Sequence, residues 1–138
     1  GRAQLYPGVP QVLDRLKGMG LRLLLLSNCP AAYLQAHRAC FELERWFDGL
    51  YCGEEFQYRP KHEILPILRM KWQGTFLVIG DREQDVEMAR RNHVPAVGCL
   101  YGYGSREELA QADQLIQNVE ELPALVEKFV RREGTQTS

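Results

Sequence analysis

Residues 75–85 read TFLVIGDREQD and carry the strongest fold signal in the chain. The first five residues are apolar or β-branched, as expected for a strand that is covered on both faces of a parallel sheet. Gly80 lets the backbone turn sharply, and Asp81 then emerges at the tip of the strand. Asp85 lies four residues further, one turn along the same face of a helix. This pattern predicts a strand-to-helix unit with two carboxylates at its turn.

The rest of the chain alternates between helix and strand patterns. Apolar residues at three- and four-residue steps predict helices, and short apolar runs between them predict strands. We expect helices at 8–19, from Pro30, after Pro60, and at 83–92, 105–112 and 119–132, with strands at 21–26, 50–52, 75–79, 96–100 and 114–116. This order predicts a three-layer, Rossmann-like α/β fold with a mostly parallel sheet. We expect one domain over residues 1–138, with a frayed tail at 133–138.

Composition and charge argue against several classes of protein. The 138 residues are 45% hydrophobic and 25% charged, which is ordinary for a globular domain and unlike a disordered chain. Seventeen basic and eighteen acidic residues give a net charge of −1, so we expect no nucleic acid partner. The apolar run at 23–26 is far too short to span a membrane. We therefore expect a cytoplasmic protein with no membrane partner and with four reduced cysteines.

Polar residues follow two predicted strands and precede one predicted helix. They are Ser27, Asn28, Arg59, Lys61, Asp81 and Asp85. Because the carboxyl ends of parallel strands meet at one edge of a sheet, we expect these side chains to face one cleft. Carboxylates suit Mg²⁺, while a Ser hydroxyl and a Lys ammonium suit phosphate oxygens. Each residue also has a purely structural explanation, such as capping of a helix by Asp81.

Three segments, in this order, resemble the second, third and fourth motifs of the haloacid dehalogenase (HAD) superfamily, closest to its phosphoglycolate phosphatase-like members. They are LLLLSN (23–28), RPKHEIL (59–65) and VIGDREQDVEMARRNHVPAVGCLYGYGSREEL (78–109). The likeness runs over about residues 6–125. It implies a Mg²⁺-dependent hydrolase of phosphorylated small molecules, in which an Asp nucleophile forms an aspartyl-phosphate that water then hydrolyses.

The resemblance also implies roles for individual residues. Ser27 would hydrogen-bond the transferring phosphoryl group, with Asn28 as a further substrate-binding residue. Asp81 and Asp85 would hold the metal. The third motif usually reads Lys-Pro, whereas here a cation stands on each side of the proline. We favour Lys61 as the catalytic cation that neutralises the phosphoryl group, and Arg59 is the alternative.

The chain departs from the family pattern at the first motif. The Asp-x-Asp that carries the nucleophile and the general acid/base is absent, no Asp precedes Asp14, and the cap domain is absent too. We therefore expect Mg²⁺ to bind weakly or not at all. The chain is then a phosphatase domain that is incomplete or inactive, or a non-catalytic α/β binding or interaction module derived from a phosphatase. Because the sequence begins at Gly1, a further hypothesis is that an upstream segment, absent from this chain, completes the enzyme.

Two structural expectations follow from the absent motif and from the cysteines. In the family, the nucleophile strand lies between the strands that here occupy 21–26 and 75–79. We favour direct pairing of these two segments, and next a strand supplied by a second copy, hence a homodimer. A strand from the chain's own amino terminus is a further alternative. Separately, a thiol enzyme with Cys29 as nucleophile and His37 as base is conceivable, but a free cysteine is usually a small buried hydrophobe.

Overall fold

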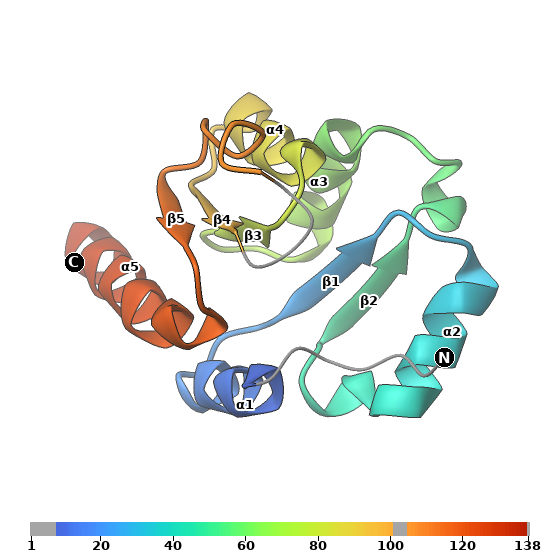
Figure 1. The fold of residues 1–138 in the computed structure, drawn as a ribbon, viewed down its shortest axis with the longest axis horizontal. Helices are drawn as coiled ribbons and strands as arrows, with labels where there is room; N and C mark the ends of the chain where they lie inside the picture. The colour runs from blue at the N-terminus through green and yellow to red at the C-terminus, as the bar shows by residue number, and fades with distance from the viewer. Residues whose placement is uncertain (1–7, 101–104, 138) are drawn as a thin grey trace. The chain divides into compact units, whose positions relative to one another are not determined.

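Helices and strands alternate along the chain, as the sequence predicts (Figure 1). The computed structural model describes residues 8–100 and 105–137. The chain divides into two compact units, residues 1–59 and 60–138. Every strand pairing within them is parallel, so the predicted α/β fold with parallel strands is confirmed. The single domain over 1–138 stays a prediction.

The first unit places two strand ends side by side. Its elements are α1 (Val9–Gly18), β1 (Leu24–Ser27), α2 (Ala31–Phe41), η1 (Leu43–Arg45), β2 (Gly49–Cys52) and η2 (Glu54–Phe56). β1 and β2 pair in register, with Ser27 opposite Cys52. Pro30 is the N-cap of α2, where the missing N–H of proline costs no helical hydrogen bond. Cys29, Leu34 and Cys52 form a buried cluster, so the strand ends are anchored on apolar packing.

The second unit is built around the buried strand β4. Its elements are α3 (Lys61–Lys71), β3 (Val78–Gly80), α4 (Glu83–Arg91), β4 (Ala96–Cys99), β5 (Gln114–Ile116), η3 (Val119–Glu121) and α5 (Leu122–Thr137). The strand order is β3-β4-β5. A Cβ on Gly98 would lie 2.8 Å from Leu115 and 3.2 Å from Leu109. Glycine at this position therefore lets Leu109, which is fully buried, pack directly on the sheet.

The structure differs from the predicted elements in several places. β1 and β3 start later than predicted, and α5 continues past 132 to Thr137. Residues 106–111 form turns where we expected a helix at 105–112. The N–H of Leu109 donates to the Ser105 carbonyl four residues back, but those of Ala110 and Ala112 donate only three residues back. The segment therefore forms successive turns and not a continuous helix. The predicted glycine loop at 101–104 lies outside the described residues.

The expected direct pairing of 21–26 with 75–79 would join the two units and stays a prediction. β1 is hydrogen-bonded to β2, and β3 to β4, so each strand has its partner within its own unit. In both cases a helix carries the chain from one strand to the parallel strand beside it, which is the usual way to connect such a pair.

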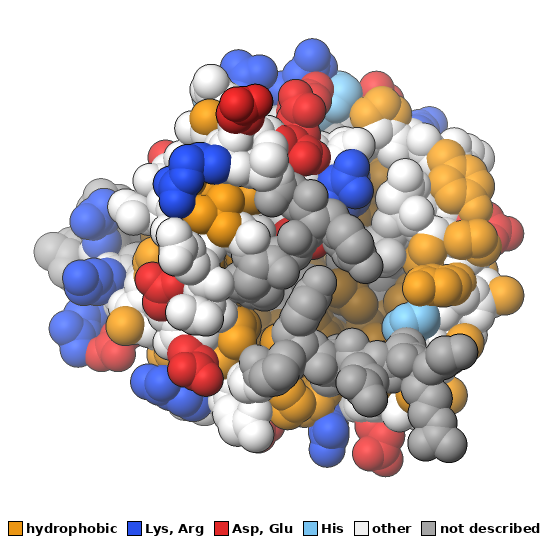
Figure 2. Space-filling model, in the orientation of Figure 1, with side chains coloured by type: hydrophobic (Ala, Val, Ile, Leu, Met, Phe, Trp, Pro, Cys, Tyr) orange, Lys and Arg blue, Asp and Glu red, His pale blue; other side chains and the backbone are white. Residues whose placement is uncertain are grey.

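The surface mixes both signs of charge. Figure 2 shows Lys and Arg side chains beside Asp and Glu side chains on the face drawn. Across residues 8–100 and 105–137, no helix combines the length and the apolar character that crossing a membrane would require. The compartment stays a prediction.

Asp48 ties the end of α1 to the start of β1. Its Oδ2 accepts hydrogen bonds from Lys17 Nζ and from the N–H of Leu23, both at 2.8 Å. The Asp48 N–H donates to the Leu23 carbonyl at 2.7 Å. The hydrogen bond from Lys17, with a smaller contribution from the Leu23 N–H, holds the pKa of Asp48 below its ordinary value.

We expect Asp48→Asn to lower the Tm at pH 7 by about 1 to 4 °C, as for a partly exposed ion pair. A carboxyl whose pKa is lowered by folding stabilises the folded state above its ordinary pKa of about 3.9 and loses that contribution as the pH falls through the folded-state pKa. Thermal unfolding followed by circular dichroism should therefore show a difference between wild type and variant that shrinks from pH 7 to pH 3. A constant difference would contradict this account.

Candidate active site

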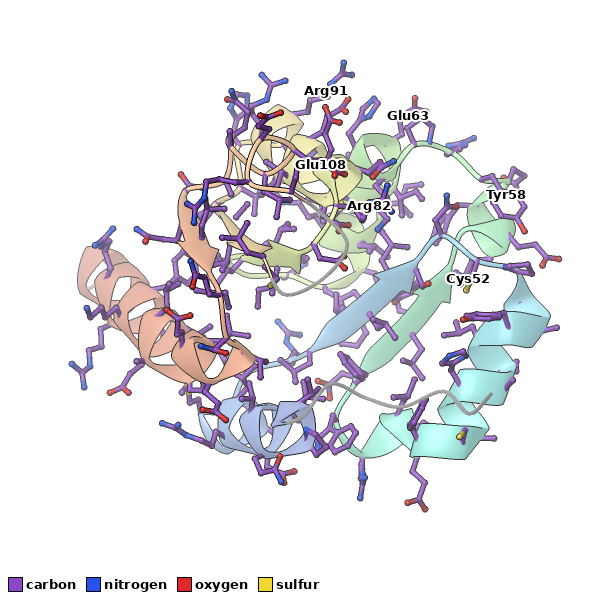
Figure 3. All side chains as sticks on the ribbon, in the orientation of Figure 1. Cys52, Tyr58, Glu63, Arg82, Arg91 and Glu108 are labelled. Atoms are coloured by element: carbon purple, nitrogen blue, oxygen red, sulfur yellow. The ribbon has the colours of Figure 1, made fainter. Side chains whose placement is uncertain are left out.

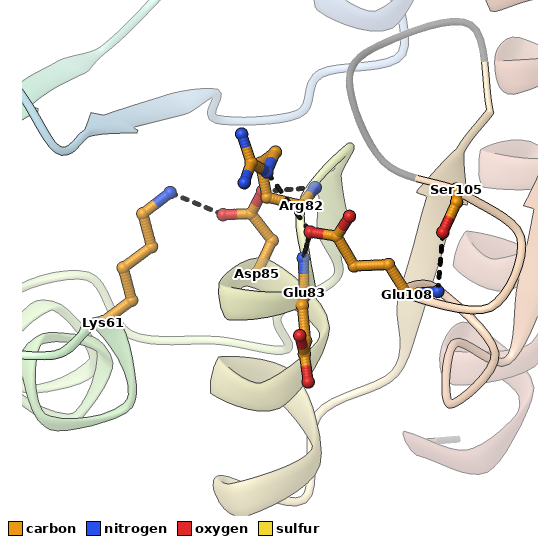
Figure 4. Close-up of polar contacts among 6 residues, drawn as sticks. All are labelled: Lys61, Arg82, Glu83, Asp85, Ser105 and Glu108. Atoms are coloured by element: carbon orange, nitrogen blue, oxygen red, sulfur yellow. Dashed lines mark hydrogen bonds and ion pairs between the residues drawn. The ribbon is translucent and has the colours of Figure 1, made fainter.

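The carboxyl end of β3 carries the acidic part of the site. Gly80 ends β3, half-buried Asp81 follows it, and Asp85 lies in the first turn of α4. Asp85 is 8% exposed and is the one buried charged residue among those the structure describes. Its Oδ1 accepts a hydrogen bond from Nζ of Lys61, the first residue of α3, at 2.6 Å (Figure 4). A largely buried ion pair thus joins the starts of two helices.

Glycine is required at position 80 because the Asp85 side chain occupies the space of a Cβ there. A Cβ at this position would lie 2.3 Å from the Asp85 Cβ and 2.4 Å from its Oδ2. The described glycines with a positive φ are Gly8, Gly20 and Gly74, so the backbone conformation at Gly80 does not itself require glycine. The Asp85 side chain lies against the Gly80 backbone. Its Oδ2 also accepts the N–H of Arg82 at 3.3 Å.

A carboxylate that the sequence analysis did not single out lies at the same end of α4. Oε1 of Glu108 accepts the N–H of Glu83 at 2.9 Å and a hydrogen bond from Arg82 Nε at 3.2 Å (Figures 3 and 4). The N–H of Glu83 is the main cause of a lowered pKa of Glu108, and Arg82 adds to it. The pattern Ser105-x-x-Glu108, typical of helix starts, was the available signal.

In the first unit, Ser27 and Asn28 lie at the carboxyl end of β1. The Ser27 carbonyl accepts the N–H of Cys29 at 2.9 Å and that of Gly53 at 2.8 Å, so the segments that follow β1 and β2 are tied together. A Cβ on Gly53 would lie 2.3 Å from Oδ1 of Asn28 and 3.1 Å from the ring of Tyr58. Gly53 therefore makes room for the Asn28 side chain.

Tyr58 follows β2 at the same end of the first unit (Figure 3). Its side chain is half exposed, and its backbone has a φ of 55°, a left-handed conformation that is uncommon without glycine. Partial desolvation raises the pKa of its hydroxyl, and the nearby charge of Glu54 adds to this.

The structure brings some of the predicted residues together. Lys61 at the start of α3 contacts Asp85, and Asp81 follows β3 four residues before Asp85, all in the second unit. Arg59 is exposed at the end of the first unit. That Ser27 and Asn28 face the same cleft as these residues stays a prediction.

The donor set of the second unit fits Mg²⁺ only in part. Asp81 and Asp85 offer hard carboxylate oxygens, and Mg²⁺ commonly takes one or two carboxylates plus water and phosphate oxygens. Within 8–100 and 105–137, no three His, Cys, Asp or Glu side chains are grouped to hold a metal. Lys61 also competes for one oxygen of Asp85. Two carboxylates of this kind fit a weakly held Mg²⁺.

The thiol alternative has no support in the geometry. Cys29 is buried in an apolar cluster with Leu34 and Cys52. Nδ1 of His37 lies 3.1 Å from the carbonyl of Tyr33, one helical turn back. The imidazole is therefore used within α2.

We expect Gly80→Ala to displace Asp85 from Lys61, because the new methyl occupies the space of the carboxylate. Overpacking of this kind costs about 1 to 3 kcal/mol, which urea denaturation would measure. Gly18→Ala is the matched control, since nothing lies within 4 Å of a Cβ there. The control should be neutral or slightly stabilising. Equal losses in the two variants would contradict the role given to Gly80.

Comparison with known proteins gives concordant matches. The family described as haloacid dehalogenase-like hydrolase matches residues 1–93. Phosphoglycolate phosphatase of Escherichia coli strain K12 is 29% identical over 128 residues, covering 88% of this chain and 51% of the relative. A 5'-nucleotidase of Pseudomonas aeruginosa is 31% identical over 110 residues, covering 77% and 50%. The chain thus spans about half the length of the curated relatives it matches.

A solved structure gives the same picture at the level of the fold. A protein described as a predicted phosphatase from Clostridium acetobutylicum superposes with a TM-score of 0.81 at 27% identity. The match covers 91% of this chain and 61% of that one.

Proposed function

Because the chain belongs to the haloacid dehalogenase-like hydrolase family, we propose that it is a phosphatase-type core that binds the phosphoryl group of a phosphorylated small molecule together with Mg²⁺. The observation that carries this proposal is the ion pair between Lys61 and the buried Asp85, which lies just after the end of β3. The relatives named phosphoglycolate phosphatase and 5'-nucleotidase support the same class of ligand.

Each residue has a distinct task in this proposal. Lys61 neutralises phosphoryl oxygens as a point charge, and Ser27 donates a hydrogen bond to them. Asp81 and Asp85 hold Mg²⁺, which when bound offsets the negative charge of the phosphate. In phosphoryl transfer, such positioning and charge neutralisation supply most of the catalysis.

We further propose that these 138 residues do not hydrolyse phosphomonoesters by themselves. The family route needs a carboxylate nucleophile, and the first acidic residue of the chain is Asp14. Asp14 lies within α1, and its Oδ1 accepts the indole N–H of Trp46 at 2.8 Å. Since Trp46 is buried, this carboxylate serves the packing of the first unit. The chain would then bind its ligand without turning it over, as a non-catalytic module does.

We expect the purified 138-residue chain to show no Mg²⁺-dependent hydrolysis of para-nitrophenyl phosphate above background. The physical reason is the absent nucleophile and not a lack of phosphate-binding groups. Released para-nitrophenolate is measured by absorbance, with Asp81→Asn as the comparison. Turnover that copurifies with the chain and disappears in Asp81→Asn would overturn this part of the proposal.

We expect Lys61 and not Arg59 to be the cation that binds phosphate. Titration of inorganic phosphate in the presence of Mg²⁺, followed by calorimetry, should show affinity reduced about tenfold or more in Lys61→Met, since a hydrogen bond to a charged group contributes about 1.5 to 3 kcal/mol. Arg59→Met is the matched control and should change the affinity less than about twofold. Lys61→Arg keeps the charge that compensates Asp85. A larger loss in Arg59→Met would reverse the assignment.

A further inference from the structure

We propose that Glu108 is a positioning residue that fixes the turn between Asp81 and Asp85, so that the two carboxylates are held ready for a divalent cation. This role rests on the proposed function. A single oxygen of Glu108 binds both residues that follow Asp81, through the side chain of Arg82 and the N–H of Glu83 (Figure 4). These bonds link positions 26 and 25 residues apart.

The start of α4 needs such a partner because its own N-cap side chain provides none. The first N–H groups of a helix have no acceptor within the helix, and Ser, Thr, Asp or Asn at the N-cap usually supplies one. Here the N-cap is Arg82, which makes no side-chain capping bond. Glu108 provides the acceptor from another segment, and its charge also suits the positive end of the helix dipole. Glu108 thus supplies the acceptor for the N–H of Glu83, the first residue of α4.

Glu108 is itself held on the sheet. Its N–H donates to Oγ of Ser105 at 3.1 Å. Leu109, the next residue, is fully buried and packs where Gly98 of β4 lacks a Cβ. The carboxylate of Glu108 therefore projects from a backbone fixed to β4, and a contact from a fixed support costs little entropy when it forms.

Loss of Glu108 would change the position of the proposed metal-binding carboxylates through the backbone between them. Asp85 Oδ2 accepts the N–H of Arg82, and Glu108 holds the Arg82 side chain and the next N–H along the chain. Removing a residue that supports a metal ligand from outside the coordination shell typically weakens metal affinity by about 10- to 100-fold. We expect the low end of this range, because Lys61 still orients Asp85.

The chain offers a matched control for this contact. Oε2 of Glu121 accepts the N–H groups of Gln117 and Asn118, both at 2.8 Å, ahead of η3. It makes the same kind of carboxylate-to-backbone bonds in the same unit, but it makes them after β5, which β4 separates from β3. Glu121→Ala should therefore lower the Tm much as Glu108→Ala does, without affecting the metal.

The experiment compares wild type, Glu108→Ala, Glu108→Gln and Glu121→Ala. Calorimetric titration with Mn²⁺ gives the metal affinity, and amide hydrogen exchange of a peptide covering 81–86 gives the order of the turn. We expect about tenfold weaker Mn²⁺ binding and faster exchange in Glu108→Ala, with wild-type values for both in Glu121→Ala. Glu108→Gln keeps an acceptor for the Glu83 N–H, so its Mn²⁺ affinity and exchange rate should lie between those of wild type and Glu108→Ala. If Glu108→Ala does not fold, Glu108→Gln alone provides the test.

Two results would overturn the proposal. One is wild-type exchange at 81–86 in the Glu108 variants, and the other is an equal loss of Mn²⁺ affinity in Glu121→Ala. If the wild-type chain itself binds no Mn²⁺, the metal part of the proposed function fails. The exchange measurement, made without metal, then decides alone whether Glu108 positions the turn.

Discussion

The buried carboxylate of Asp85 constrains the second unit more than any other group. A charge removed from water is tolerated only when it is paired and hydrogen-bonded. Lys61 supplies the paired charge, and the N–H of Arg82 binds the other oxygen. These contacts connect the first turns of α3 and α4, and the Asp85 side chain leaves no room for a Cβ at Gly80. Burial of Asp85 therefore requires both the charge of Lys61 and the absence of a side chain at Gly80.

Both units use a glycine to bring a polar side chain onto a strand end. In the first unit, Asn28 occupies the space that a Cβ of Gly53 would need, and in the second Asp85 does the same at Gly80. Each glycine stands at or next to the end of a strand, where hydrogen bonds to the neighbouring strand restrict movement. Polar groups held on regular elements are placed more accurately than groups on loops, as a phosphate-binding site requires.

Carboxylates also join segments that are distant in the sequence. Asp48 binds the N–H of Leu23, and Asp113 binds that of Ala96 at 2.8 Å, in each case just before or at the start of a strand. Glu108 acts in the same way at the start of α4. Several acidic side chains of this chain thus serve its architecture. Asp85 differs from them because it is buried beside a lysine, which is why it stands out as a candidate ligand.

The sequence by itself determined the order of helices and strands, the parallel α/β class and the family, together with Lys61, Asp81 and Asp85 as candidate residues. Apolar periodicity and the Gly-Asp-x-x-x-Asp pattern are local, so a short window contains all of the information needed. Only the tertiary structure decided that 106–111 forms turns, that Gly80 makes room for Asp85, and that Glu108 accepts a hydrogen bond from the start of α4. The last of these contacts and the burial of Leu109 depend on residues brought together across the sheet. No local pattern can report them, because their energies arise only once the chain has folded.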